Sequence, residues 1–204
     1  FFGFWPPTMP LTESLTMLAA SRRKLDYGRI RLWGSLAFIA SSVLAGRMLL
    51  DRPETIIFWM ALILVGFAVA AAAMLPDIRA PKAGGGRLVL IEVLGNKKFL
   101  LFLATAALLQ SAHGVYYGFG TLNWQRAGLW AIGVTAEIVL FVFSAAVVRK
   151  IGPVRLLALA GLAGMVRWTV IGATDALPAL ILVQVLHAFT FGAAHLGAIY
   201  FIAR

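Results

Sequence analysis

The stretch that decides the fold is "IIFWMALILVGFAVAAAAML" at residues 56–75, which carries no charged side chain. A helix that crosses the hydrocarbon core of a bilayer needs about 20 mostly apolar residues, and this stretch has that length. The whole chain agrees with it, because 61% of its residues are hydrophobic and only 13% are charged. Soluble domains are roughly 45–50% apolar and about 25% charged. We therefore place the chain among membrane proteins.

Similar apolar segments recur along the chain, with prolines at several of their borders, where proline costs little. The candidate spans are 1–20 (incomplete), 30–50, 56–75, 99–122, 130–148, 154–173 and 177–201. Open sheet edges cannot stand in lipid, and the segments lack the strict alternation of barrel strands. We predict an all-α transmembrane helical bundle of about seven spans.

The basic residues fall mostly on one side of these predicted spans. Of the 18 Lys and Arg, Arg47, Arg52 and Arg126 lie on the opposite side and Arg167 lies within a span, while all the others share one side. This asymmetry is the positive-inside pattern and makes that side cytoplasmic. The formal charge of +10 therefore needs no nucleic-acid partner, and we expect a lipid bilayer instead.

The longest polar stretch, 76–98, divides the chain. Its Gly84–Gly86 run and Pro81 are typical of a flexible linker, and "RLVLIEVLGNKKF" after them suits a short amphipathic helix on the membrane surface. We predict two helical bundles, 1–75 and 99–204, joined by a cytoplasmic linker. Because the chain begins and ends within apolar segments, we expect it to be part of a larger protein. A tight turn or a missing loop explains the short junction near 128–130.

Polar residues line up inside two of the spans. "QSAHGVYYGF" follows an uncharged apolar run, and from Gln110 the offsets +3, +7 and +11 give His113, Tyr117 and Thr121. The same offsets from Gln184 give the set His187, Phe191 and His195. At about 100° per residue each set occupies one narrow helix face. These faces suit the lining of a wet cavity between related segments, as in secondary transporters, although Gln and His also join helices by hydrogen bonds.

Ionisable side chains within lipid are costly and are by default candidates for function. Glu137 and Arg167 each lie 12 residues from a basic residue at the end of their spans, so both are about 18 Å deep. We predict that they form an ion pair, which is either a structural staple or a proton-sensitive pair. Glu13 follows "PPTMPLT", where the prolines are expected to break the helix beside a binding site or simply to kink it.

Motifs of other function classes are missing from the sequence. "AGGGRLVL" lacks the Lys-Ser/Thr end of a nucleotide-binding loop, no His-Glu-x-x-His motif occurs, and no Gly-x-Ser-x-Gly elbow is present. The chain has no cysteine, and its three histidines are too scattered to form a zinc site by themselves. We expect no cofactor, no metal and no enzymatic activity.

Several motifs resemble the major facilitator superfamily, and within it the phenylpropionate-permease-like group of proton-coupled transporters. They are "PLTESL" at Pro10–Leu15, "LDYGRIRLWGSLAF" at Leu25–Phe38, "HGVYYGF" at His113–Phe119, "AEIVLF" at Ala136–Phe141, "VRWTVIGAT" at Val166–Thr174 and "VLHAFTFGAAHLGA" at Val185–Ala198. The resemblance implies twelve helices in two six-helix bundles, of which these spans are the fourth to the tenth. It also implies that the spans of Glu13, His113 and His187 border a central cavity.

Our hypothesis is a symporter of the bacterial inner membrane that carries a small organic solute, such as an aromatic acid, together with protons. The candidate residues for binding solute or protons are Glu13, Gln110, His113, Tyr116, Tyr117, Glu137, Arg167, Gln184, His187 and Phe191. Within this set, the Tyr and Phe rings would stack on an aromatic solute. The alternatives are a nucleoside or sugar permease of the same fold, a membrane-embedded enzyme and a non-transporting sensor.

Overall fold

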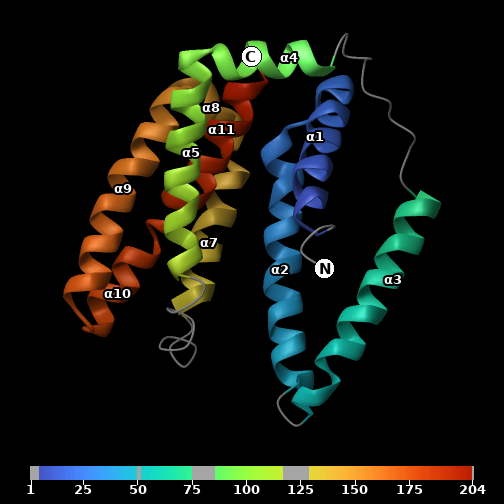
Figure 1. Cartoon of the computed structure of the whole chain (residues 1–204). Helices are drawn as coiled ribbons and strands as arrows, with labels where there is room; N and C mark the ends of the chain where they lie inside the picture. The colour runs from blue at the N-terminus through green and yellow to red at the C-terminus, as the bar shows by residue number, and fades with distance from the viewer. Residues whose placement is uncertain (1–4, 50–51, 75–85, 117–128, 204) are drawn as a thin grey trace. The chain divides into compact units, whose positions relative to one another are not determined.

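The computed structural model describes residues 5–49, 52–74, 86–116 and 129–203, and most of these residues lie in helices (Figure 1). The described part of the chain contains no strand, as expected for a chain surrounded by lipid. The chain divides into two compact units. The first consists of Phe1–Tyr27 and Leu36–Lys82, and the second of Gly28–Ser35 and Ala83–Arg204.

Three long helices supply the first unit and one short turn connects two of them. The elements are α1 (Trp5–Arg23), α2 (Tyr27–Leu49), the 3₁₀ turn η1 (Pro53–Thr55) and α3 (Ile56–Met74). The helical turns at the start of α2, Gly28–Ser35, belong to the second unit. No residue of α3 is buried, which suits a helix whose side chains are all compatible with lipid.

The second unit contains the remaining helices. They are α4 (Gly86–Gly95), α5 (Lys97–Val115), α7 (Leu129–Val142), α8 (Ser144–Ile151), α9 (Pro153–Ala173), α10 (Leu177–Gln184), the π-helical segment η4 (Ala188–Ala193) and α11 (Ala194–Ile202). Within this unit η4 packs against both α7 and α9, and α11 packs against α9. The buried residues of the unit gather around these elements.

Each of the seven predicted spans contains helix, and several boundaries fall where the sequence places them. Pro53 begins η1, Pro153 begins α9 and Pro178 lies in the first turn of α10, where a missing backbone N–H leaves no hydrogen bond unmade. Among the described residues, four helical stretches are long and apolar enough to cross a membrane, or five if α7 and α8 together form one span. The described parts of the predicted spans 1–20 and 99–122 lie in α1 and α5, which are not in that count.

One prediction about helix continuity was wrong, and one predicted span contains a bend. The prolines near the N-terminus do not break the helix, because α1 runs from Trp5 through Pro10 to Arg23. Two of these prolines lie in its first turn, where proline is tolerated. The predicted span 130–148 contains two helices, α7 and α8, bent by 72° at Phe143. Neither proline nor glycine occurs at the bend, so the sequence does not predict it.

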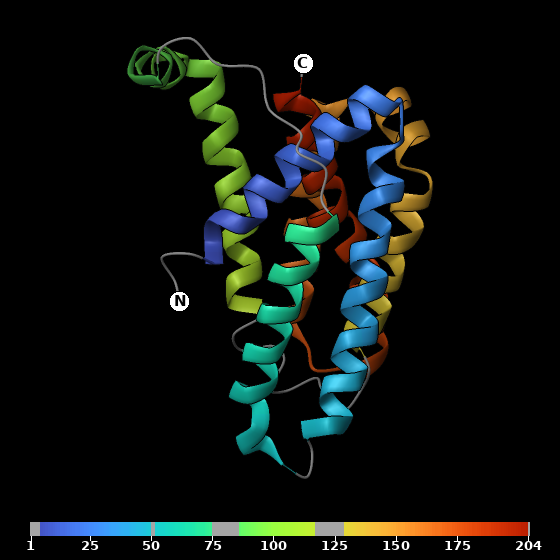
Figure 2. The ribbon, with the colours of Figure 1, turned by 90° about the vertical axis from the view of Figure 1, so that its right-hand side faces the viewer.

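Helices α4 and α5 meet at Asn96, which lies within the predicted linker 76–98. Asn96 caps α5, since its side-chain Oδ1 accepts hydrogen bonds from the backbone N–H groups of Lys98 and Phe99. Helix α4 is short and turns sharply away from α5 (Figures 1 and 2). This arrangement is compatible with a surface helix before a span. The flexible part of the predicted linker and the junction near 128 lie outside the described residues.

Candidate functional site

Arg167 is the centre of a buried polar cluster in the second unit, and none of its surface is exposed. Its Nη1 donates hydrogen bonds to Nδ1 of His187 at 3.2 Å and to Oγ1 of Thr190 at 3.0 Å. Its Nη2 donates to Oε1 of Gln184 at 3.0 Å. The guanidinium carbon lies 4.5 Å from the centre of the Tyr116 ring and 4.6 Å from that of Trp168. Two aromatic faces and three acceptors thus surround the cation.

The bond from Arg167 fixes the protonation of His187. A guanidinium only donates, so Nδ1 of His187 must be the acceptor, and the proton of the neutral ring is on Nε2. That Nε2 lies 3.5 Å from Oε2 of Glu137, while Oγ of Ser35 donates to Oε1 of Glu137 at 2.9 Å. Both carboxylate oxygens therefore face donors.

Glu137 and Arg167, which were predicted from equal depth to form an ion pair, are joined through His187, whose imidazole contacts both groups. The three side chains form a chain of contacts from carboxylate to imidazole to guanidinium. All three are buried, with 4%, 3% and 0% of their surfaces exposed. A neutral ring bridging a buried anion and a buried cation offers one more protonation site than a simple pair does.

Three partners of Arg167 come from one short stretch and are spaced three residues apart: Gln184, His187 and Thr190. In an α-helix, positions separated by six residues point in different directions. Here the backbone is tightened, because Val185 N–H bonds to Leu182, and the N–H groups of 186, 188 and 189 likewise bond three residues back. At three residues per turn the three side chains share one face. The π-helical segment η4 then widens the helix again.

Two glycines allow the helices to approach closely at the cluster. A Cβ at Gly133 of α7 would lie 3.1 Å from the Cβ of His187. A Cβ at Gly192 of η4 would lie 2.9 Å from Cδ2 of Leu140 and 3.4 Å from Cγ of Glu137. Small residues at such contacts let the backbones of membrane helices come together. They bring the carboxylate of α7 within reach of the imidazole.

Two further residues come from α5 and its C-cap position, His113 and Tyr116. The Tyr116 hydroxyl donates to Oε1 of Gln184 at 3.0 Å, so this oxygen accepts from both tyrosine and arginine. Nδ1 of His113 donates to the carbonyl of Leu109 at 3.1 Å, since a carbonyl can only accept. The His113 ring lies 5.7 Å from that of His187, measured between ring centres.

The predicted helix face that begins at Gln184 contains a stack of three rings. Phe191 lies 5.4 Å from His187 with nearly parallel planes, and His195 lies 6.3 Å from Phe191 in the same arrangement. Phe191 also meets the edge of His113, with 5.7 Å between the ring centres. The two predicted helix faces, which begin at Gln110 and Gln184, therefore meet through His113, His187 and Phe191.

The structure does not bring every candidate residue to the cluster. Gln110 is exposed on α5, and Tyr117 and Thr121 lie outside the described residues. Glu13 belongs to the first unit, where the Tyr27 hydroxyl donates to its Oε2. The roles proposed for Gln110, Tyr117 and Glu13 stay predictions.

Three members of the cluster were missed in the sequence: Ser35, Thr190 and Trp168. A Ser or Thr within an apolar helix is common and usually bonds to its own backbone, so neither residue stood out. Trp168 follows Arg167 directly, and an α-helical pattern separates neighbours by about 100°. The signal that could have found Thr190 is its three-residue spacing from His187.

The side-chain Nε2 of Gln184 donates no hydrogen bond within the cluster. Its Oε1 accepts two hydrogen bonds, which fixes the orientation of the amide. Its Nε2 is buried and has no hydrogen-bond partner among the described residues. A buried donor without a partner costs stability and therefore calls for a reason, such as a ligand or an ordered water.

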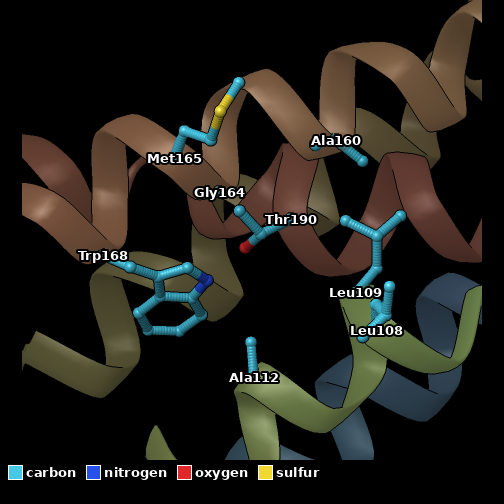
Figure 3. Close-up of a pocket in the computed structure, with 9 residues that line it drawn as sticks. Leu108, Leu109, Ala112, Ala160, Gly164, Met165, Trp168 and Thr190 are labelled. Carbon is cyan, nitrogen blue, oxygen red and sulfur yellow. The ribbon is translucent and has the colours of Figure 1, made fainter. Parts of the chain in front are cut away.

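An apolar recess of about 210 Å³ adjoins the cluster (Figure 3). Leu109 and Ala112 of α5 line one side, Gly164 and Trp168 of α9 line the other, and the hydroxyl of Thr190 lies between them. Because Thr190 also accepts from Arg167, the recess extends to an immediate partner of the cation. The arrangement pairs an apolar space with a charged group, which is common in sites for small organic molecules.

The described residues contain no group of three or more His, Cys, Asp or Glu side chains placed to hold a metal ion. What the cluster offers is a buried cation, a buried anion and a neutral imidazole between them. Such a group can take up a proton and can attract an anion.

Comparisons with known proteins agree on one class of protein. The model of the MFS_1 like family matches residues 1–204. The chain is 38% identical to a probable 3-phenylpropionic acid transporter of Escherichia coli, over 98% of this chain and 56% of the relative. It is 32% identical to a maltose permease of Geobacillus stearothermophilus, over 96% and 52%. The chain thus spans about half the length of these curated relatives. No solved structure matches it.

Proposed function

Because the chain belongs to the MFS_1 like family, we propose that the intact protein is a secondary transporter that takes up a small organic acid together with protons. It is placed in the bacterial inner membrane, with the predicted basic loops on the cytoplasmic side. Alternating access of two helical bundles to a site near the midplane would carry the solute across. The predicted bundles at 1–75 and 99–204 supply parts of both.

The observation that carries this proposal is the buried series Glu137, His187 and Arg167. Charged side chains at the centre of a span cost roughly 2.5–3.5 kcal/mol each on insertion scales. A helix bundle that only needed to fold could use apolar residues there. A role in binding a charged solute and a proton would explain why charged residues occur at these positions.

The surroundings of Arg167 favour an acid with an aromatic or other apolar part. The rings of Tyr116 and Trp168 flank the guanidinium, and the apolar recess extends from Thr190. The Escherichia coli relative is named for an aromatic acid, which supports the same solute class. The relative named as a maltose permease makes a sugar the competing solute.

The test is uptake by the intact protein reconstituted in proteoliposomes. We expect radiolabelled 3-phenylpropionate to accumulate when the outside is more acidic, and to equilibrate without accumulation when the pH gradient is collapsed. Maltose serves as the competing solute under the same gradient. Accumulation of maltose but not of 3-phenylpropionate would replace the organic acid with a sugar, and uptake independent of the gradient would remove the coupling to protons.

A further inference from the structure

We propose that one end of the second unit binds the headgroups of anionic phospholipids in the leaflet on the predicted cytoplasmic side. Five basic side chains are exposed there, and we call this set the basic end: Lys97, Lys98, Arg149, Lys150 and Arg155. None of the five forms an ion pair with another residue in the part of the chain that the structure describes. Their charge is therefore available to a partner from outside the chain.

Helix α11 brings the two parts of the basic end together. The ring of Phe201, near the end of α11, stacks on Phe102 of α5 with 4.4 Å between the ring centres, one turn after Lys98. A Cβ at Gly197 of α11 would lie 3.0 Å from the carbonyl oxygen of Pro153, the first residue of α9. The start of α5 and the junction of α8 with α9 therefore both lie beside the last turns of α11, at one end of the unit (Figure 1).

Two of these helices begin with basic residues, although the positive end of a helix dipole favours acidic ones. Lys97 and Lys98 are the first two residues of α5, and Arg155 is the third residue of α9. Neither helix has an acidic residue in its first turn. Within the chain itself these three positions are electrostatically unfavourable. An anion bound from outside would reverse the sign of that effect.

The carboxylates of the second unit do not balance the basic end. Among its described residues the acidic side chains are Glu92, Glu137 and Asp175. Glu137 is buried in the polar cluster, and Asp175 follows the end of α9, about 30 Å from the start of that helix. Glu92 of α4 is the acidic side chain that remains near the five basic ones. The excess of positive charge calls for a partner with negative charge.

Exposed apolar side chains beside the charges favour a lipid over an anion dissolved in water. Leu101 of α5 lies one turn after Lys97 and is 70% exposed, and Val154 of α9 precedes Arg155 and is 60% exposed. Ile202, in the last turn of α11, is 62% exposed. A phospholipid offers acyl chains to these side chains and a phosphate to the Lys and Arg heads, whose methylene stems pack along the apolar surface. A nucleotide or an acidic protein offers only the charge.

Lipid binding to the intact protein in a neutral detergent tests the proposal, with native mass spectrometry as the measurement. The probes are phosphatidylglycerol, phosphatidylcholine with the same acyl chains, and glycerol 3-phosphate as a soluble anion. We expect phosphatidylglycerol to bind at least about tenfold more tightly than phosphatidylcholine. Its affinity should fall as salt is added, because the charges are exposed. Glycerol 3-phosphate should bind weakly.

Paired substitutions locate the site on the protein. Lys97→Gln with Lys98→Gln removes two charges at the start of α5, and Arg149→Gln with Lys150→Gln removes two at the end of α8. Each basic residue near an anionic surface is worth about fivefold in affinity, so each pair should weaken phosphatidylglycerol binding by about 25-fold. The matched control removes the same charge from two exposed residues on the predicted opposite side of the membrane, Arg47→Gln with Arg52→Gln, and should change the affinity less than about twofold.

The unchanged protein keeps the test decisive even if a variant fails to insert, since basic residues also set the orientation of spans. Phosphatidylglycerol should raise its thermal unfolding midpoint in detergent, and phosphatidylcholine should not. Equal affinity for the two lipids, or an equal loss in the Arg47 and Arg52 control, would overturn the proposal. Binding of glycerol 3-phosphate as tight as that of phosphatidylglycerol would replace the lipid with a soluble phosphate. None of these measurements involves uptake, so their outcome is independent of the proposed transport.

Discussion

Helices α3 and α9 both qualify as membrane spans, but α3 exposes its apolar side chains and α9 buries a charged one. Helix α3 has no polar side chain and no buried residue, and large residues such as Ile63 and Phe67 are about two-thirds exposed, at 66% each. Helix α9 buries Arg167 completely and surrounds it with three hydrogen-bond acceptors and two rings. In lipid, exposed apolar residues are at no disadvantage, whereas a buried charge requires a complete set of partners. This difference is the reason why we propose that the buried polar cluster of the second unit has a functional role.

The largest effect should come from removing the charge of α9. In Arg167→Met the side chain keeps much of its length, but Glu137 loses its compensating charge. Breaking a buried charged pair in this way costs about 3–5 kcal/mol. We expect uptake per folded protein to fall by at least about 100-fold and the thermal unfolding midpoint in detergent to fall as well.

The matched change in α3 is Ile63→Met, which replaces one exposed apolar side chain with another. Its effect on stability should stay within about 0.5 kcal/mol, and uptake should be unchanged. Equal losses in the two variants would show that the contrast between the helices has no functional content.

A smaller effect should follow from tightening the approach of α7 to the cluster. In Gly133→Ala the new methyl group would lie 3.1 Å from the Cβ of His187, an atom fixed to the backbone. In Gly192→Ala the close atom is Cδ2 of Leu140, the flexible end of a side chain, at 2.9 Å. Overpacking typically costs about 1–3 kcal/mol where the neighbours cannot move. We expect uptake to fall about tenfold for Gly133→Ala and about twofold for Gly192→Ala.

Initial rates of uptake in proteoliposomes measure the difference. Gly66→Ala in α3 is the control, because a Cβ there meets no atom within 4 Å. If Gly192→Ala proves the more harmful of the two, the position of His187 is not what the close approach protects.

The positions of the helices along the chain could be predicted from the sequence. The orientation of each helix about its own axis could not. Apolar length and border prolines such as Pro153 predicted where helices lie, because lipid leaves few alternatives. The bend at Phe143 was not predictable, since neither proline nor glycine marks it. Depth along a helix follows from counting residues, and Glu137 and Arg167, which were predicted to lie at equal depth, both contact His187. That His187 lies between them depends on how each helix is turned.

Thr190 illustrates a second limit. An assumed period of 3.6 residues separates Thr190 from Gln184 around the helix, whereas the three-residue turns in between bring both to Arg167. Local tightening of a helix depends on packing against its neighbours, which a single sequence does not reveal. The presence of polar residues in these spans was therefore predictable. Which of them contact Arg167 was predictable only in part.

Two substitutions of Tyr116 distinguish the two ways in which this residue supports Arg167. Tyr116→Phe removes the hydroxyl that donates to Gln184 at 3.0 Å but keeps the ring, whose centre is 4.5 Å from the guanidinium carbon. Gln184 still accepts from Arg167, so the loss is one hydrogen bond of about 1 kcal/mol and a fall in uptake of about fivefold. Tyr116→Leu also removes the aromatic face and should lower uptake further, since a desolvated cation–π contact contributes about 2 kcal/mol.

Phe58→Leu in α3, at a ring that is 64% exposed, is the control for the loss of an aromatic face that touches no cation, and it should leave uptake unchanged. Initial uptake rates normalised to folded protein should therefore decrease in the order Phe58→Leu, Tyr116→Phe, Tyr116→Leu. Equal rates for the two variants at position 116 would mean that the ring contributes nothing beyond its hydroxyl. The aromatic cage around Arg167 would then be a consequence of packing, and α9 would differ from α3 only in its hydrogen bonds and charge.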